Sequence, residues 1–269
     1  MANKPQTKMK ELIQQFAPIT LAEMSGIRLL NRTDTKFVTS LPLLRELLTL
    51  AKDDYYVQEI DGERIAPYYT VYFDTPEHDM YMLHQNGHAF REKLRIRSYV
   101  DSNLNFLEVK VKNNHGRTIK SRLKADDFDP KHPDYDILRK HLQEKDDQWI
   151  SFLRQHLHFD PKRLGEQLEN HFDRITLVNK QKTERLTIDM NLRLDNLETG
   201  RNVTFSNVVI IELKRDGLKP SPILNYLRLL RIHPLSFSKY TIGTAMTNDA
   251  VKHNRLKPRI RRICKIEQQ

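Results

Sequence analysis

Phe90-Arg91-Glu92-Lys93-Leu94-Arg95-Ile96-Arg97-Ser98-Tyr99 is the stretch of sequence that decides the fold. Side chains alternate across a β-strand, so one face of this stretch is mostly apolar and the other carries four cations, Arg91, Lys93, Arg95 and Arg97. Like charges this close repel one another unless an anion lies among them. The same alternation returns at Glu108–Lys112, Lys120–Lys124 and Ile211–Lys214. Such strands predict a sheet whose polar face is a binding surface.

The overall charge also favours an anionic partner. The chain has 45 Lys and Arg against 35 Asp and Glu, which gives +10 at pH 7. Nucleic acid, polyphosphate, a nucleotide and an acidic membrane surface all fit this charge. The length of 269 residues allows one sizeable core.

Cysteine content and hydropathy exclude several classes of protein. Because Cys264 is the only cysteine, an intrachain disulfide and a cysteine-built zinc site are excluded. The N-terminus lacks the apolar core of a signal peptide, and no apolar run approaches the ~20 residues of a membrane-spanning helix. We therefore expect a cytoplasmic protein that would need a membrane partner protein for any role at a membrane.

The pattern of the chain predicts one domain rich in strands. Strands are expected at Arg28–Thr39, Tyr55–Ile60, Tyr68–Phe73, Phe90–Tyr99, Asn105–Lys112, Thr118–Lys124, Phe172–Asn179, Glu184–Asp195 and Asn202–Leu213. Helices are expected near Met9–Phe16, over Ser40–Ala51, Tyr135–His156 and Pro222–Ile232, and from Phe237 onward. The expected organisation is an N-terminal helical segment (1–28), the domain (29–250) and a basic C-terminal tail (251–269).

Fold class follows from these strands. Eight or so antiparallel strands close readily into a barrel. The apolar strand faces, with Leu94, Ile96 and Leu213 among them, must be covered by the amphipathic helices. The charged faces then line the interior, where Arg, Lys and Glu are costly to bury without partners. We predict an α+β fold with a closed antiparallel β-barrel, whose charged tunnel holds water or an anion with its metal.

Six motifs occur in an order that resembles a known family. They are Arg32-Thr33-Asp34-Thr35-Lys36, Lys93-Leu94-Arg95-Ile96-Arg97, Glu108-Val109-Lys110-Val111-Lys112, Arg185-Leu186-Thr187-Ile188-Asp189, Ile211-Glu212-Leu213-Lys214 and Phe237-Ser238-Lys239-Tyr240. From about Leu29 to Met246 the chain resembles the VTC-type polyphosphate polymerase domains. These belong to the triphosphate tunnel metalloenzyme superfamily, which also holds the CYTH-like triphosphatases.

The resemblance implies transfer of the terminal phosphate of ATP to a growing polyphosphate chain, with Mn²⁺ or Mg²⁺ as cofactor. It implies catalytic roles for Lys36, Glu212 and Lys239, and metal binding by Glu212, with Glu108 as a second candidate. The implied phosphate-binding residues are Lys36, Arg95, Arg97, Lys110, Lys120, Arg174, Arg185, Lys214, Ser238 and Lys239. The chain departs from the family pattern at Asp34, where glutamate is usual, and at Phe172, where a tyrosine is common.

Two other functions stay open at this point. The same cationic cradle would serve hydrolysis of inorganic or nucleoside triphosphate, because the two reactions differ only in whether water or a phosphate oxygen attacks. A non-catalytic polyphosphate-binding module is the second alternative. Specific nucleic-acid binding is not expected, because the strand cations are not interleaved with aromatic residues for base stacking. We interpret His78, His84 and His88 as surface residues, and the basic tail as a solvated segment.

Overall fold

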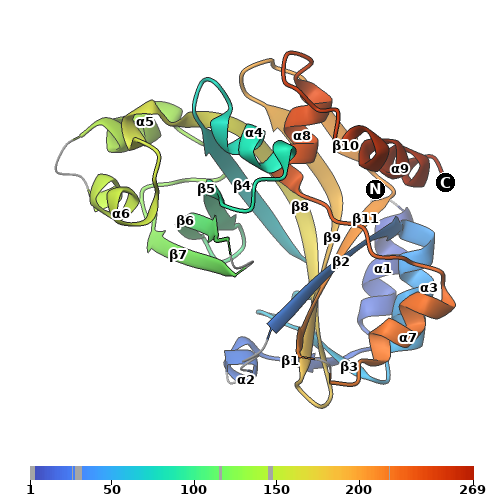
Figure 1. The fold of residues 1–269 in the computed structure, drawn as a ribbon. Helices are drawn as coiled ribbons and strands as arrows, with labels where there is room; N and C mark the ends of the chain where they lie inside the picture. Colours follow the sequence, from blue (N-terminus) through green and yellow to red (C-terminus); the bar gives the residue numbers. More distant parts are fainter. Residues whose placement is uncertain (1–3, 26, 28–31, 115–116, 145–147, 218) are drawn as a thin grey trace.

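A computed structural model gives the fold (Figure 1) and describes residues 4–25, 27, 32–114, 117–144, 148–217 and 219–269. The strands are β1 (Ala17–Ile19), β2 (Arg32–Ser40), β3 (Tyr55–Gln58), β4 (Ala66–Asp74), β5 (Arg91–Tyr99), β6 (Leu104–Lys112), β7 (Thr118–Lys124), β8 (Gly165–Asn179), β9 (Glu184–Asn196), β10 (Asn202–Phe205) and β11 (Val208–Asp216). The helices are α1 (Lys4–Ile13), α2 (Leu21–Ser25), α3 (Leu41–Ala51), α4 (Asp79–Asn86), α5 (Tyr135–Gln143), α6 (Gln148–His156), η1 (Pro161–Arg163), α7 (Pro222–Leu229), α8 (Lys239–Thr247) and α9 (Lys257–Glu267).

One large sheet organises the molecule. Its strand order is β2-β11-β9-β8-β4-β5-β6-β7, and every neighbouring pair in this order is antiparallel. β10 and β3 pair with β9 and β8, and β1 adds to β3 in parallel. The predicted α+β class with a large antiparallel sheet is therefore confirmed.

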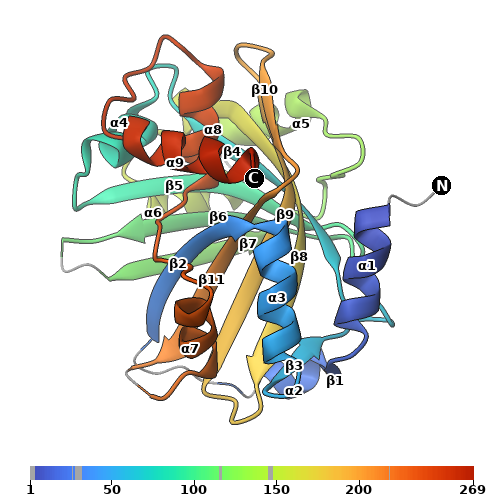
Figure 2. The ribbon, with the colours of Figure 1, turned by 90° about the vertical axis from the view of Figure 1, so that its right-hand side faces the viewer.

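The prediction of a closed barrel is wrong. Among the described strands, β2 and β7 end the sheet and do not pair with each other. The outer edge of β2 is already occupied, because Pro234 forms a bridge with Phe37 and the Leu235 N–H donates to the Lys36 carbonyl at 2.9 Å. β7 exposes alternate cations along its length, and charged edge strands resist pairing. The sheet is curled and stays open between β2 and β7 (Figures 1 and 2).

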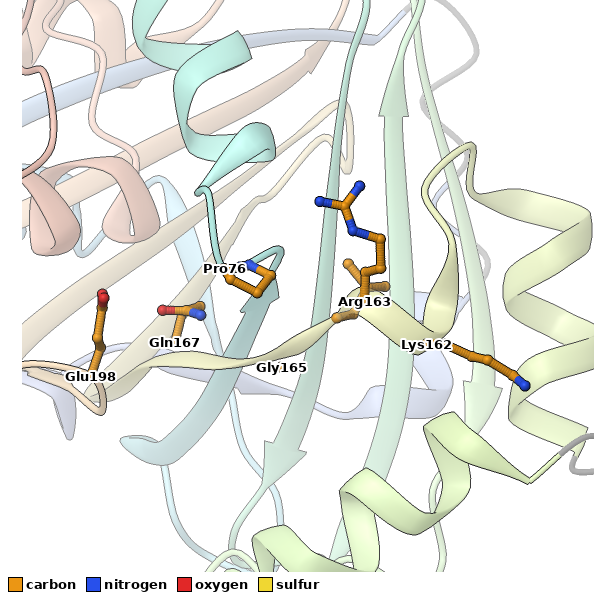
Figure 3. A pocket seen from close by; sticks show the side chains of 7 residues that line it. Pro76, Lys162, Arg163, Gly165, Gln167 and Glu198 are labelled. Carbon is orange, nitrogen blue, oxygen red and sulfur yellow. The ribbon is translucent and has the colours of Figure 1, made fainter.

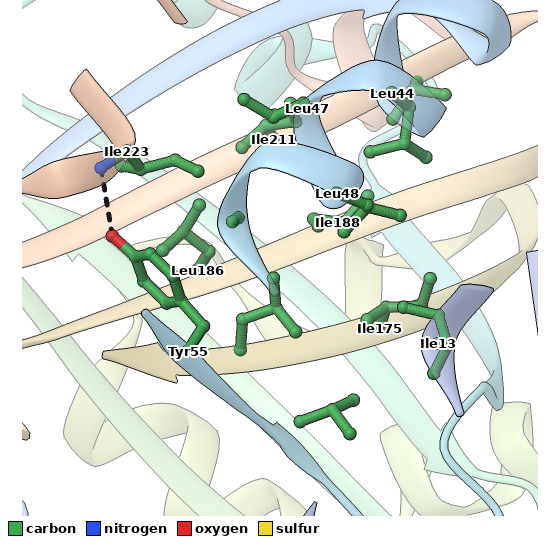
Figure 4. Packing of buried hydrophobic residues seen from close by; sticks show 14 of the residues in the cluster. Ile13, Leu44, Leu47, Leu48, Tyr55, Ile175, Leu186, Ile188, Ile211 and Ile223 are labelled. Carbon is green, nitrogen blue, oxygen red and sulfur yellow. Dashed lines mark hydrogen bonds between the residues drawn. The ribbon is translucent and has the colours of Figure 1, made fainter. Parts of the chain in front are cut away.

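Helices cover the convex face of the sheet, as the apolar strand faces predict. On one side, α1, α3 and α7 pack against β2, β8, β9 and β11, where Leu44, Leu186 and Ile211 are fully buried (Figures 2 and 4). On the same convex face, toward β7, α5 and α6 cover β4, β5 and β6 around Leu94, Ile96 and Leu107. These two cores pack against the curled sheet. The curl in turn brings the side chains of the concave face toward one another.

The concave face is charged at its middle and apolar toward one end of the strands. On β2 and β11 the cations and carboxylates of the middle give way to Val38, Val208 and Ile210, which pack with Phe237 and Tyr240 beneath α8 and α9. The predicted helix opening near Phe237 is therefore present, and it covers one end of the concave face. Residues 251–269, expected as a solvated tail, contain α9, whose Ile263 is fully buried.

Three further elements differ from the predictions. Helix α4 was not expected; buried Asp74 accepts hydrogen bonds from the backbone N–H groups of Met80 and Tyr81, both at 2.9 Å. Asn202–Leu213 divides into β10 and β11 because Glu267 of α9 accepts from the intervening backbone. Tyr135–His156 divides into α5 and α6, and residues 28–31 of the first predicted strand lie outside the described residues. In the part of the chain that the structure describes, no helix is long and apolar enough to cross a membrane.

Candidate functional site

The concave face gathers the predicted site residues from seven strands and one helix start. We call this group the concave cluster. It comprises Lys36 on β2, Arg95 and Arg97 on β5, Glu108 and Lys110 on β6, Lys120 on β7, Arg174 on β8, Arg185 on β9, Glu212 and Lys214 on β11, and Ser238 and Lys239 at the start of α8. Two residues without a predicted role, Lys93 and Asp189, join it.

Glu212 is shared between two lysines. It lies directly opposite Lys36 on β2, whose ammonium donates to Oε1, while Lys214 Nζ lies 3.0 Å from Oε2. Burial would raise the pKa of Glu212, but Lys214 and Lys36 outweigh it and hold the pKa well below its usual range. The carboxylate is thus ionised, and its side chain keeps 18 % of its surface exposed.

Glu108 forms the second shared carboxylate. Arg95, its cross-strand neighbour, donates to Oε2 from Nε at 2.9 Å and from the terminal nitrogen at 2.7 Å, and Lys120 contacts Oε1. Burial would raise the pKa of Glu108, yet Arg95, Arg97 and Lys120 lower it to about 2. This side chain is only 1 % exposed.

Asp189 on β9 is the third, and sequence reasoning missed its role. Arg174 on β8 makes a two-point contact with it, at 2.6 Å and 2.8 Å, and Lys239 donates to the same carboxylate. Burial opposes ionisation, but Arg174 and Lys239 hold the pKa of Asp189 well below its usual range. The signal was present in the motif Arg185–Asp189, where Asp189 shares a strand face with Arg185.

Three basic side chains of the cluster have no carboxylate within ion-pair distance among the described residues. Lys93 donates to the Ser238 hydroxyl at 2.8 Å, which also caps α8. Arg97 lies 5.8 Å from the centre of the Tyr68 ring. Burial, then Arg95 and Lys36, lower the pKa of Lys110 to about 8. Lys36 on β2 contributes to this shift, although β2 and β6 lie near opposite ends of the sheet. The curl of the sheet therefore brings these two strands to face each other across the concavity.

Two aromatic rings, those of Tyr68 and Phe172, make cation–π contacts with cations of the concave cluster. Phe172 stacks on Tyr68 with ring centres 5.1 Å apart, and the Lys239 ammonium lies 4.0 Å from the centre of the Phe172 ring. Arg174 lies over both rings, at 4.7 Å and 5.1 Å. Phe172 therefore contributes cation–π contacts to both Arg174 and Lys239.

A family model of the VTC domain matches residues 31–248 of this chain. The chain belongs to the VTC domain family. A candidate adenylate cyclase from Bacillus halodurans has the same fold, with 13% identity and a TM-score of 0.50 over 78% of this chain and 96% of that one. A candidate adenylyl cyclase from Hippeastrum, described with a dominant triphosphatase activity, gives 16% identity and a TM-score of 0.47 over 82% and 98%. The comparison with curated proteins finds no match.

The two carboxylates predicted to bind metal differ in how well they fit that role. Glu212 of this VTC domain is ionised and faces the concavity with part of its surface exposed, so an oxygen released by Lys36 or Lys214 can reach a divalent ion. Glu108 is almost fully buried, and both of its oxygens are engaged by cations. Its surroundings fit a structural counter-ion better than a metal ligand.

Other polar groupings lie away from the concave cluster. Glu169, His171 and Asp195 have ligand atoms within 4.8 Å of one another, but β8 places Glu169 and His171 on the opposite face of the sheet. A pocket lined by Pro76, Arg163 and Glu198 (Figure 3) contains no predicted site residue. His78, interpreted as a surface residue, is buried and lies 3.0 Å from Glu198. None of these groups shares residues with the cluster.

Proposed function

We propose that the concave cluster binds a triphosphate or polyphosphate chain and transfers the terminal phosphate of ATP to the end of polyphosphate. Membership of the VTC domain family supports chemistry on such substrates. In this proposal Lys36, Glu212 and Lys239 act at the reacting phosphate. The remaining basic residues hold the chain.

One observation carries the proposal. Each of three carboxylates is shared by two cations, and Lys93, Arg97 and Lys110 add positive charge without a carboxylate of their own in the described structure. The ten basic side chains of the concave cluster thus outnumber its three carboxylates. A ligand with many negative charges, spaced along a chain, matches this arrangement better than a single phosphate does.

The residues present suit phosphoryl transfer, which asks a protein mainly for positioning and for neutralising charge. Arg95 and Arg174 are held by two-point contacts, so their guanidinium groups are oriented before substrate binds. Lys36 and Lys214 neutralise Glu212 in the free protein and are placed to turn toward phosphate. A bound divalent metal would supply further neutralisation of phosphate oxygens and orientation of the reacting groups.

The test is incubation of the purified protein with ATP and Mn²⁺ or Mg²⁺, followed by separate assays of polyphosphate and of free phosphate. The proposal predicts long polyphosphate chains, formed only with metal. Release of phosphate without polymer would instead establish hydrolysis and overturn the transfer reaction. Arg95→Ala combined with Arg97→Ala tests the site and should weaken tripolyphosphate binding. Because Arg95 pairs with the buried carboxylate of Glu108, circular dichroism checks the fold of this variant, and Arg97→Ala alone carries the test if the double variant unfolds.

A further inference from the structure

Helix α9 brings a second group of cations to the end of the concave cluster. Figures 1 and 2 both place α9 at the same end of the molecule as α4 and α8. Its Ile260, Ile263 and Ile266 pack into the core beneath α8. Helical spacing places half-buried Arg259 beside this apolar stripe and leaves exposed Arg261 and Lys265 on the opposite face of α9.

The segment just before α9 is held against the turn that leads into β5. The Arg255 guanidinium, just before α9, donates to the Asn86 carbonyl at the end of α4. Gly87 lies beside this contact, and a Cβ at that position would lie 2.8 Å from Arg255 Nη1. From the other side of the same turn, Arg91 donates to the His88 carbonyl at 2.7 Å. Arg255, just before the start of α9, and Arg91, on β5, therefore both donate to backbone carbonyls of this turn.

His84 marks the junction of the two groups. Burial lowers the pKa of its imidazole to about 2, together with Lys93, Arg91, Arg259 and Lys110, which are all close enough to contribute. Arg259 of α9 is thus a neighbour of cations that belong to the strand face. Because burial and these cations keep its pKa low, His84 adds no positive charge to the group.

We propose that Arg91, Arg255 and Arg259 form a basic extension of the concave cluster that holds the part of a long polyphosphate chain lying outside it. This inference rests on the proposed function, and it adds a site that contacts only those chains long enough to extend beyond the concave cluster. Polyphosphate is the occupant that the structure favours, because Arg91 shares the concave face of β5 with Lys93 and so makes the extension continuous with the cluster. An acidic membrane surface is the competing occupant.

The solvent face of α9 provides a control that removes the same charge. Arg261 and Lys265 are one helical turn apart and exposed, and they lie on the face of α9 opposite the apolar stripe. Arg255→Gln with Arg259→Gln and Arg261→Gln with Lys265→Gln remove the same charge. A difference between the two variants therefore reports position and not net charge.

The experiment measures the affinity of the full chain and both variants for long-chain polyphosphate and for tripolyphosphate. We expect the Arg255/Arg259 variant to bind long chains about three- to tenfold more weakly, in line with two exposed charge contacts, and tripolyphosphate as the unaltered protein does. The Arg261/Lys265 variant should bind both like the unaltered protein. If the Arg255/Arg259 variant melts at a lower temperature, Arg259→Gln alone carries the test.

Equal effects of the two variants on long chains would overturn the extension. So would a selective loss of binding to vesicles containing phosphatidylserine with polyphosphate affinity unchanged. Failure of the unaltered protein to bind tripolyphosphate would contradict the proposed function itself, and is thereby distinguished from failure of the extension.

Discussion

Single residues of the concave cluster are organised around carboxylates that each restrain two cations. Glu212 differs from Glu108 and Asp189 in exposure, at 18 % against 1 % and 5 % of its side chain. The two buried carboxylates fix arginines in place, whereas Glu212 holds two lysines whose flexible side chains can change partner. Under the proposed function, this difference assigns Glu108 and Asp189 to positioning and Glu212 to the reacting phosphate.

Replacement of Glu212 by Gln tests that role. The amide keeps the shape of the side chain but loses the charge that a divalent metal requires, so we expect metal-dependent turnover to fall by at least about a hundredfold. Circular dichroism and the melting curve should show a retained fold. Asp249→Asn, which alters an exposed carboxylate paired with Arg201, is the control and should leave turnover unchanged. Full activity of Glu212→Gln would remove Glu212 from the metal site.

The pH dependence of binding follows from Lys110 and Lys239, whose pKa values are both lowered to about 8, first by burial and then, for each, by nearby arginines. A bound polyanion favours the charged ammonium, so binding raises both pKa values and takes up protons above pH 8. Tripolyphosphate affinity should therefore fall as pH rises from about 8 toward 10, and calorimetry should record proton uptake there. Lys110→Arg, which stays charged, should flatten the profile; an unchanged profile would contradict the role of Lys110.

Residue types at the site were largely readable from the sequence, because alternation along a strand determines which side chains share a face. Arg95, Lys110 and Glu212 could be placed on one surface in this way. The ion-pair partners could not, since the pairing of Arg174 with Asp189 depends on the register between β8 and β9. That register includes an irregularity between His171 and Asp173, which no local pattern in the sequence reveals.

At the scale of elements, α8 connects the core to the site. Its N-cap residue Ser238 accepts from Lys93 on β5, its first residue Lys239 reaches Asp189 on β9, and its buried Gly243 rests on β8 and β9. The helix was predicted from the residues at its start. Helix α4 was not, because the carboxylate that accepts from its first turn, Asp74, is held in place by the hydroxyl of Tyr240, which is distant in sequence.

The close approach of α8 to the sheet predicts a cost for Gly243→Ala. The added Cβ would lie 2.7 Å from Leu168 Cδ2 and 3.3 Å from Leu194 Cδ1, and both leucines are fully buried. We expect the free energy of unfolding to fall by about 1–3 kcal/mol, measured by chemical denaturation. Gly165→Ala, whose Cβ meets nothing within 4 Å, should change it by no more than ~0.5 kcal/mol. Equal values for the two variants would show that α8 can move away from the sheet without cost.

At the scale of the whole molecule, the curl of the sheet makes the site from strands that are far apart in the chain. Lys36 on β2 and Lys110 on β6 belong to opposite ends of the sheet and yet interact. Sequence patterns predicted the antiparallel sheet and its covering helices but also a closed barrel. Closure fails at the edge of β2, where Pro234 and Leu235 lie, and this long-range contact has no local signature.

An anion that bridges the two ends of the sheet should stabilise the whole fold. Tripolyphosphate at a hundred times its dissociation constant should add about 2.7 kcal/mol to the free energy of unfolding and raise the melting temperature. Monophosphate at the same concentration reaches fewer of the cations and should produce a smaller shift. The variant with Arg95→Ala and Arg97→Ala should lose most of the tripolyphosphate effect. An equal response to both anions would indicate a single-phosphate site.

The most direct test of the central claim is a crystal structure of the protein with tripolyphosphate and Mn²⁺. We predict that the phosphates lie on the concave face, within hydrogen-bond distance of Arg95, Arg97 and Lys239, and that the metal contacts Glu212. Phosphate density confined to the convex face or to the surface of α9, with the concave cluster still paired as it is in the free protein, would contradict the account.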